Sequence, residues 1–172
     1  MAKFVPQEEL SLTDQMRIRR EKLTQLQSEG KNPFAQTRFE TNTTSEEIKN
    51  HFDEMEGKPV SLAGRIMTKR GMGKVLFCDL QDAAGRIQLY VKFDEMPEEQ
   101  FNDFRKYDIG DIVGVHGDVF RTQRGEISVR VHEQTLLTKA LLPLPDKFHG
   151  LTNLETRYRQ RYVDLIVNPN VK

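Results

Sequence analysis

VLFCDLQDAAGRIQLYV, residues 75–91, contains two short runs in which apolar side chains alternate with polar or aromatic ones. The apolar positions of the two runs are Leu76, Cys78, Leu80, Ile87, Leu89 and Val91. A period of two is typical of β-strands with one buried face. The segment DAAG between them, residues 82–85, has the composition of a tight turn. We therefore expect a hairpin of two half-buried strands.

The same alternation occurs in three further stretches, residues 60–66, 113–120 and 127–132. Residues 97–107 instead begin with a proline and two glutamates and place Phe101 and Phe104 on one face, which is typical of a helix. Three strands, a helix and two strands is the order of an OB-fold, a five-stranded Greek-key barrel. We predict an all-β core of this type, with flanking helices and an α-helix between the third and fourth strands.

Helical segments are expected on both sides of the barrel. One begins at Ser11 or Thr13 and ends at Gly30, and a shorter one covers residues 45–53. An extended proline-rich linker follows the strands, and residues 154–166 form a last helix with an apolar stripe. We divide the chain into a helical extension (1–58), a barrel domain (59–140) and a linker with a helix (141–172) that leads into a second domain beyond the end of the chain.

Composition excludes several classes of function. Lysine and arginine number 26, as do aspartate and glutamate, so the chain is no general polycation, although a local basic groove stays possible. A single cysteine, Cys78, and four scattered histidines predict no disulfide and no metal site. No acid–base pair or phosphate-binding loop predicts catalysis. The sequence lacks a signal peptide or an apolar run of membrane-spanning length, so we expect a cytoplasmic protein with no membrane partner.

Two outward positions of the central hairpin suggest nucleic-acid binding. Strict alternation places Phe77 on the outer face of its strand, and Gln88 on the same face of the next strand. An outward aromatic ring is a platform for a stacked base, and a neighbouring amide can read the edge of that base. The alternatives are that Phe77 packs under a terminal helix and that Gln88 only contacts solvent.

Charged residues supply further candidates. Lys69, Arg70 and Lys74 surround two glycines in the predicted connection between the first and second strands, where they can neutralise phosphates, or simply be solvated. Glu126 precedes the fifth strand and can accept a hydrogen bond from a base or pair with Arg124. The first helix carries further cations that suit either a phosphate backbone or solvent: Arg17, Arg19 and Arg20.

Longer motifs resemble a known family. Residues 64–74 (GRIMTKRGMGK), 80–82 (LQD) and 85–91 (GRIQLYV), together with Phe77, resemble the OB-fold of class IIb aminoacyl-tRNA synthetases, the lysine, aspartate and asparagine enzymes. Residues 137–140 (LTKA), 143–150 (PLPDKFHG) and 157–165 (RYRQRYVDL) are similar to the connection between the anticodon domain and the catalytic core in bacterial-type lysyl-tRNA synthetases.

The resemblance implies roles for individual residues. Phe77 would stack on the central anticodon base, a uridine in lysine tRNA, and Gln88 would hydrogen-bond the same base. Arg70 and Glu126 would contact the anticodon, and the first helix would approach the tRNA backbone. The implied partner is lysine tRNA rather than DNA.

The resemblance also implies what the parent enzyme does: it uses ATP and Mg²⁺, forms a homodimer and charges tRNA with lysine. The three catalytic signature motifs of class II enzymes are not complete in this sequence, so we expect the chain to hold no cofactor and to bind tRNA without activating lysine.

Three other interpretations stay open at this point. The chain could be a general single-strand-binding OB protein, the anticodon domain of an aspartate or asparagine enzyme, or a scaffold that supports dimerisation through its last helix.

Overall fold

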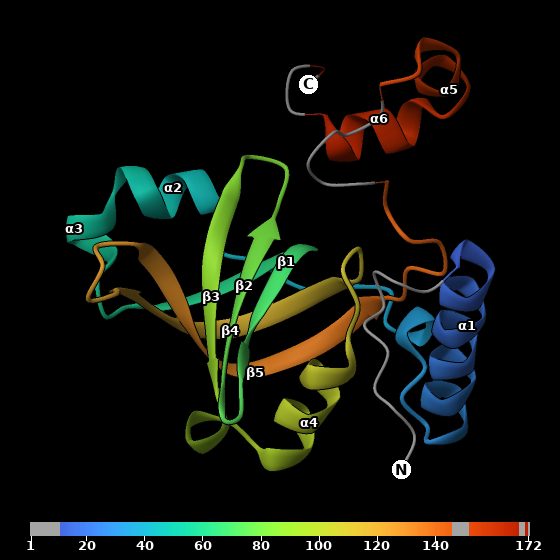
Figure 1. The fold of residues 1–172 in the computed structure, drawn as a ribbon. Helices are drawn as coiled ribbons and strands as arrows, with labels where there is room; N and C mark the ends of the chain where they lie inside the picture. The colour runs from blue at the N-terminus through green and yellow to red at the C-terminus, as the bar shows by residue number, and fades with distance from the viewer. Residues whose placement is uncertain (1–10, 146–151, 169–170, 172) are drawn as a thin grey trace.

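Five β-strands form a sheet that closes on itself in a ring (Figure 1). The computed structural model describes residues 11–145, 152–168 and 171. The strands are β1 (Pro59–Met72), β2 (Val75–Gln81), β3 (Arg86–Lys92), β4 (Ile112–Arg121) and β5 (Ile127–Thr138). They follow the order β1-β2-β3-β5-β4, and the β3–β5 pair alone among these neighbours is parallel. With helix α4 (Glu98–Lys106) between β3 and β4, this confirms the predicted OB-fold.

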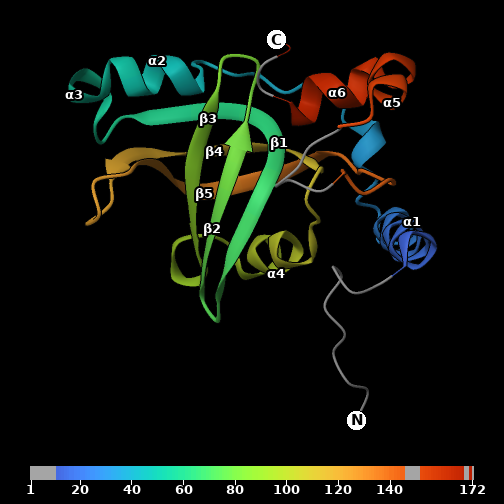
Figure 2. The same cartoon turned by 45° about the horizontal axis from the view of Figure 1, so that its top comes forward.

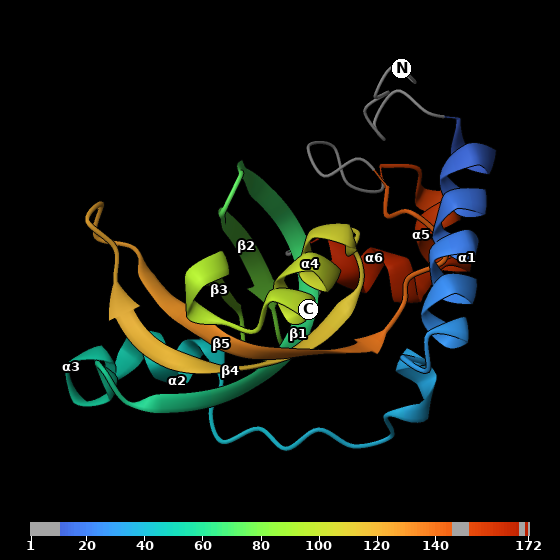
Figure 3. The ribbon, with the colours of Figure 1, turned by 90° about the horizontal axis from the view of Figure 1, so that it is seen from below.

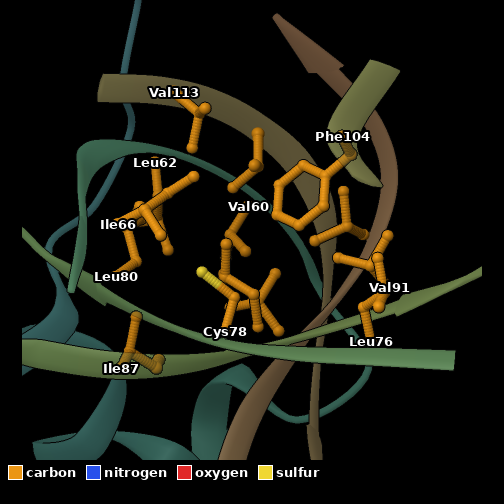
Figure 4. Close-up of a cluster of buried hydrophobic side chains, with 14 of the residues drawn as sticks. Val60, Leu62, Ile66, Leu76, Cys78, Leu80, Ile87, Val91, Phe104 and Val113 are labelled. Atoms are coloured by element: carbon orange, nitrogen blue, oxygen red, sulfur yellow. The ribbon is translucent and has the colours of Figure 1, made fainter. Parts of the chain in front are cut away.

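The core fills the inside of the ring. Burial alternates strictly along β2, so that Leu76, Cys78 and Leu80 point inward, and apolar side chains from every strand meet them (Figure 4). Two phenylalanines of α4, Phe101 and Phe104, are at most 1% exposed and complete the cluster. Because the alternating residues of β2 cannot also be buried in this core, their side chains are presented to the outer face.

Strand β1 is longer than the sequence suggested. A bulge between Ile66 and Thr68 shifts its register against β2 and buries both Ile66 and Met67. The strand then continues to Met72, and the turn that follows contains Gly73 with a φ of 68°. The segment expected to be a loop is therefore mostly strand, and Lys69 and Arg70 lie on opposite faces of it.

Strand β5 extends past the residues whose alternation identified it. It continues beyond His132 to Thr138 and stays paired with β4 to its last residue. The turn predicted at residues 82–85 joins β2 to β3 and carries a tertiary contact: the carboxylate of Asp82 accepts hydrogen bonds from the backbone N–H and the hydroxyl of Ser45, both at 2.7 Å.

The flanking helices differ from the prediction in two places. Helix α1 (Leu12–Ser28) is capped by Ser11 as expected, and a 3₁₀ turn, η2 (Pro33–Ala35), follows it. The predicted helix at 45–53 is two short helices, α2 (Ser45–Asn50) and α3 (Phe52–Met55), which meet at a non-helical His51 with ψ of 31°. A second 3₁₀ turn, η3 (Phe93–Glu95), follows β3.

The predicted helix at 154–166 is likewise two helices, α5 (Leu154–Arg159) and α6 (Arg161–Val167). Asp164 of α6 is fully buried and accepts a hydrogen bond from Nε of Arg157 at 2.9 Å, a pairing that folds α6 back onto α5. Four apolar side chains of this pair are 38–78% exposed, namely Leu154, Tyr158, Tyr162 and Leu165.

Candidate nucleic-acid interface

A groove of about 980 Å³ lies on the outer face of β2 and β3, next to the β4–β5 hairpin, the turn that projects at one end of the molecule in Figures 1 and 3. Its lining residues are Arg70, Phe77, Asp79, Gln88, Tyr90, Phe120, Arg121, Thr122, Gln123, Arg124, Glu126 and Arg130. Four of them are arginines and two are carboxylates. A chain with a formal net charge of zero therefore concentrates positive charge in this groove.

Phe77 lies in the groove rather than under a terminal helix. It is half-buried on β2, and its ring meets Tyr90 of β3 edge to face, with centroids 5.4 Å apart. The guanidinium of Arg70 lies 5.9 Å from the centre of the Phe77 ring. Arg70 itself is exposed and lines the groove beside Phe77. An aromatic ring next to a cation suits a stacked base with a phosphate nearby.

Gln88 lines the groove too, but it is 7% exposed and not the freely solvated side chain that alternation suggested. Its cross-strand partner is Asp79, whereas Phe77 faces Tyr90. The reason is the parallel β3–β5 pairing, which places Ser128 opposite Gln88, and the Ser128 hydroxyl donates to Gln88 Oε1 at 2.9 Å. The Nε2 group has no partner among the described residues, so Gln88 can donate from Nε2 to a ligand.

Glu126 stands at the mouth of the groove, immediately before β5. It is exposed, and its backbone N–H donates to Thr122 Oγ1 at 3.0 Å, which fixes the turn. Within the described part of the chain its carboxylate forms no ion pair with Arg124, the alternative that the sequence left open. Its carboxylate oxygens can therefore accept from a ligand.

Lys69 does not belong to the interface, which corrects the prediction. Its ammonium donates to the carbonyl oxygens of Phe104, Arg105 and Tyr107 at 2.7, 2.7 and 2.9 Å. These carbonyls lie at the carboxyl end of α4, where a helix leaves its last acceptors unsatisfied and favours a cation. Burial lowers the pKa of Lys69 to about 8. The side chain holds α4 against β1 and is not available to a phosphate.

Arg19 is corrected in the same way. It is 5% exposed, and Nη1 donates to the carbonyls of Ile109 and Ala140 at 3.0 and 3.3 Å. Arg17 pairs with Asp14 and Glu21 on the exposed face of α1, and Arg20 is exposed. Helix α1 lies at the opposite end of the molecule from the β4–β5 hairpin in all three views (Figures 1, 2 and 3). The structure thus does not bring the arginines of α1 to the groove.

Lys74 stands in the turn between β1 and β2, outside the groove lining. It is exposed, and its ammonium lies 5.2 Å from the centre of the Phe93 ring. Of the three cations predicted around the glycines, Arg70 alone lines the groove.

The groove residues that sequence reasoning missed include Tyr90, Phe120 and Arg130. Each occupied an outward position in the alternation of its strand, so the signal was present. The ring of Phe120 lies 5.5 Å from that of Tyr90, and the Arg130 guanidinium lies 4.7 Å from the centre of the Phe120 ring. Their meeting depends on β5 lying between β3 and β4, which alternation within single strands does not reveal.

Groups that would indicate other chemistry are placed elsewhere. Cys78 lies in the core, and burial raises its pKa to about 12, which keeps the thiol protonated. The described residues contain no cluster of three or more His, Cys, Asp or Glu side chains able to hold a metal ion. None of the described helices combines the length and apolarity needed to cross a bilayer.

Comparison with known proteins shows what the chain is similar to. Residues 60–137 match the family described as OB-fold nucleic acid binding domain. The lysine–tRNA ligase of Thermoanaerobacter sp. (strain X514) is 53% identical over 161 residues, which are 94% of this chain and 32% of that protein. The lysine–tRNA ligase of Syntrophomonas wolfei is 51% identical over 164 residues, 95% of this chain and 33% of that protein. The lysine–tRNA ligase of Halalkalibacterium halodurans is 51% identical over 172 residues, which are 96% of this chain and 34% of that protein.

These matches confirm the resemblance to the lysine enzymes rather than to the aspartate and asparagine enzymes. The chain spans about a third of the length of the curated relatives it matches. Residues 60–137 are thus similar to the OB-fold nucleic acid binding domain, and almost the whole chain is similar to part of the lysine–tRNA ligases.

Proposed function

We propose that this chain is the anticodon-binding part of a lysine–tRNA ligase and that its groove binds the U-rich anticodon of lysine tRNA. The observation that carries the proposal is the groove itself, where aromatic rings and four arginines from β1, β4, β5 and the β4–β5 turn surround the β2–β3 face of an OB-fold. Single-stranded RNA is recognised by stacking unpaired bases on aromatic side chains and by hydrogen bonds to the base edges.

In this proposal Phe77 is the platform for the central base and Gln88 selects it. The amide oxygen of Gln88 already accepts a hydrogen bond from Ser128, which leaves the amide nitrogen as the unpaired group that can donate to a base. Uridine presents carbonyl oxygens that accept such a bond, whereas cytosine presents an amino donor in place of O4. A donating glutamine therefore favours uridine. Glu126 offers the complementary acceptor for a base N–H, and Arg70 lies where a phosphate or base edge would approach.

We propose that the whole protein joins lysine to tRNA, as the names of its relatives say. The use of ATP and Mg²⁺, a homodimer and a cytoplasmic location are further parts of the proposal, and they rest on the resemblance of the sequence to lysyl-tRNA synthetases. The present chain contributes the selection of tRNA, and the chemical steps are assigned to the portion of the relatives that it does not span.

The test is the binding of an anticodon stem-loop with the sequence UUU, followed by a panel in which each anticodon base is substituted. Phe77→Ala is expected to weaken binding by roughly 1–3 kcal/mol, the contribution of one stacked base. Replacing the central uridine with cytosine should also weaken binding to the parent chain. Phe34, 48% exposed and outside the groove, provides the matched control, and Phe34→Ala should bind like the parent.

Equal affinities of the parent and Phe77→Ala would show that Phe77 is not the platform. Equal affinities across the base panel would favour a general single-strand-binding protein over an anticodon reader.

A further inference from the structure

The groove holds two arginine–aromatic pairs, one on each side of Tyr90. The first joins Arg70 of β1 to Phe77 of β2, with the guanidinium 5.9 Å from the ring centre. The second joins Arg130 of β5 to Phe120 of β4, at 4.7 Å. Tyr90 meets both phenylalanine rings edge to face, at centroid distances of 5.4 and 5.5 Å. The proposed function uses the first pair and leaves the second without a role.

Arg130 is held in place by a contact with Glu95. Its Nε lies 3.3 Å from Oε2 of Glu95 in η3, and each of these two atoms is buried without a hydrogen-bond partner among the described residues. The charged contact between them therefore replaces hydration for both. Glu95 also lies 3.5 Å from the ammonium of Lys92. The guanidinium is thus fixed by Phe120 and by Glu95, and does not move freely as a surface arginine does.

The exposed part of Arg130 faces the groove. Its side chain is 41% exposed and belongs to the groove lining, and no Nη atom has a hydrogen-bond partner among the described residues. Arg121, by contrast, lies over the Phe52 ring at 4.5 Å and donates to the carbonyl of Gly125. A planar cation with one face covered and its donors unused is a surface on which a base can stack, because guanidinium planes stack on bases much as aromatic rings do.

We propose that Phe120 and Arg130 form a second nucleotide subsite, which binds a base next to the one on Phe77 in the same RNA strand. The base stacks on the guanidinium of Arg130, which is itself stacked on Phe120, and the Nη atoms donate to the base edge or its phosphate. Tyr90 separates the two bases, so they bind splayed apart. Glu95 is the positioning residue of this subsite.

The inference rests on the proposed function, and a single set of titrations tests the two separately. The probes are the UUU stem-loop and three copies of it, each with one abasic nucleotide in the anticodon. The variants, made in the full chain, are Arg130→Lys, which keeps the charge and loses the plane, and Phe77→Leu, which loses the ring. Arg38, which is exposed, pairs with Glu40 and lies outside the groove, so Arg38→Lys is the matched control.

Arg130→Lys is expected to weaken binding of the UUU loop by roughly 5- to 150-fold, as for loss of one stacked base. The loss should vanish for one abasic loop, because the variant and the abasic site remove the same contact. The loss caused by Phe77→Leu should vanish for a different loop whose abasic site is adjacent. Arg38→Lys should bind all four loops like the parent. Glu95→Gln should produce a smaller loss with the same position dependence as Arg130→Lys, a readout that general destabilisation would not reproduce.

Two results would overturn the second subsite. If both losses vanish for the same abasic loop, Arg130 only supports the Phe77 site. If the loss from Arg130→Lys persists with all three abasic loops, or there is no loss, Arg130 stacks on no base. Failure of the parent chain to bind the UUU loop is distinct, since it removes the proposed function and the inference with it.

Discussion

Lys69 and Arg70 are neighbours in sequence, but their side chains lie on opposite faces of β1. The pleat of β1 turns Lys69 toward the end of α4, where three carbonyls take its ammonium, and turns Arg70 toward Phe77 in the groove. Their side chains share a charge and a local sequence, so the difference comes from the strand face alone.

The two residues therefore differ in how they affect binding in salt. Each phosphate neutralised on a single strand contributes about 0.7 to the slope of log K against log salt concentration. We expect Arg70→Gln to flatten this slope by about that amount for the stem-loop between 50 and 200 mM salt, the range over which such contacts are lost. Lys69→Gln should leave the slope unchanged and instead lower the free energy of unfolding, because α4 loses its cap. A slope that is the same in the parent and Arg70→Gln would assign Arg70 a role other than phosphate binding.

Among the secondary-structure elements, the β4–β5 hairpin depends on a β-bulge. The register of β4 against β5 shifts between His116 and Gly117, and a Cβ at Gly117 would lie 1.9 Å from the carbonyl oxygen of Arg130. Backbone cannot move aside as a flexible side chain can, so glycine is required for the two strands to approach. The bulge thereby sets the direction of β5 at Arg130, the residue that carries the second subsite.

Gly117→Ala is expected to lower the free energy of unfolding by about 1–3 kcal/mol or more, the range for overpacking at a site that cannot relax. Chemical denaturation of the parent and the variant measures this difference. Glu133→Ala, an exposed position on the same strand β5, is the control and should change stability by no more than about 0.5 kcal/mol. Equal stability of the two variants would contradict this prediction, because it would mean that β4 and β5 can move apart at the bulge with little loss of stability.

Across the whole molecule, a buried charged cluster joins three segments that are distant in sequence. Lys139 is 3% exposed and pairs with Asp108 and Asp111 at 2.9 and 2.8 Å. Lys22 of α1 pairs with Asp108 at 2.8 Å, and Arg19 reaches the carbonyl of Ala140. Helix α1 is thereby fastened to the ring and to the start of the linker. The division at residues 58 and 140 stays a prediction.

This cluster makes stability sensitive to acid. Burial raises the pKa of Asp108, but Lys139 and Lys22 outweigh it and hold the pKa at about 2. Because the folded pKa lies below the unfolded value of 3.8, the stabilisation is fully present above that value and is lost as pH falls toward 2. We expect the parent to lose about 2 kcal/mol over this window relative to Asp108→Asn, whose amide does not titrate. Urea unfolding at several pH values measures the difference. Parallel pH profiles for the two proteins would contradict the assignment.

The strands, their order and the inward side of each could be predicted from residues such as Leu76, Cys78 and Leu80, because the two-residue period of a pleated strand is a local property. The outward direction of Phe77 followed from the same period. The breaks in the helices at His51 and Gln160 were not predictable, because the sequence on each side of them continues a helical pattern. At Gln160 the break accompanies the contact between Asp164 and Arg157, which the helical pattern does not reveal.

The sequence by itself thus determined an OB-fold with one outward aromatic ring, Phe77, because the alternation within each strand and the succession of strands and helix can be read along the chain. Only the tertiary structure decided which cations remain for a ligand. Arg19 and Lys69 have carbonyl partners that are 35 to 121 residues away, and Phe120 and Arg130 join Tyr90 only because β5 pairs with both β3 and β4. Contacts of this kind depend on how the sheet closes into a ring. Closure brings together residues that are far apart in the sequence, and the alternation within one strand does not predict which of them meet.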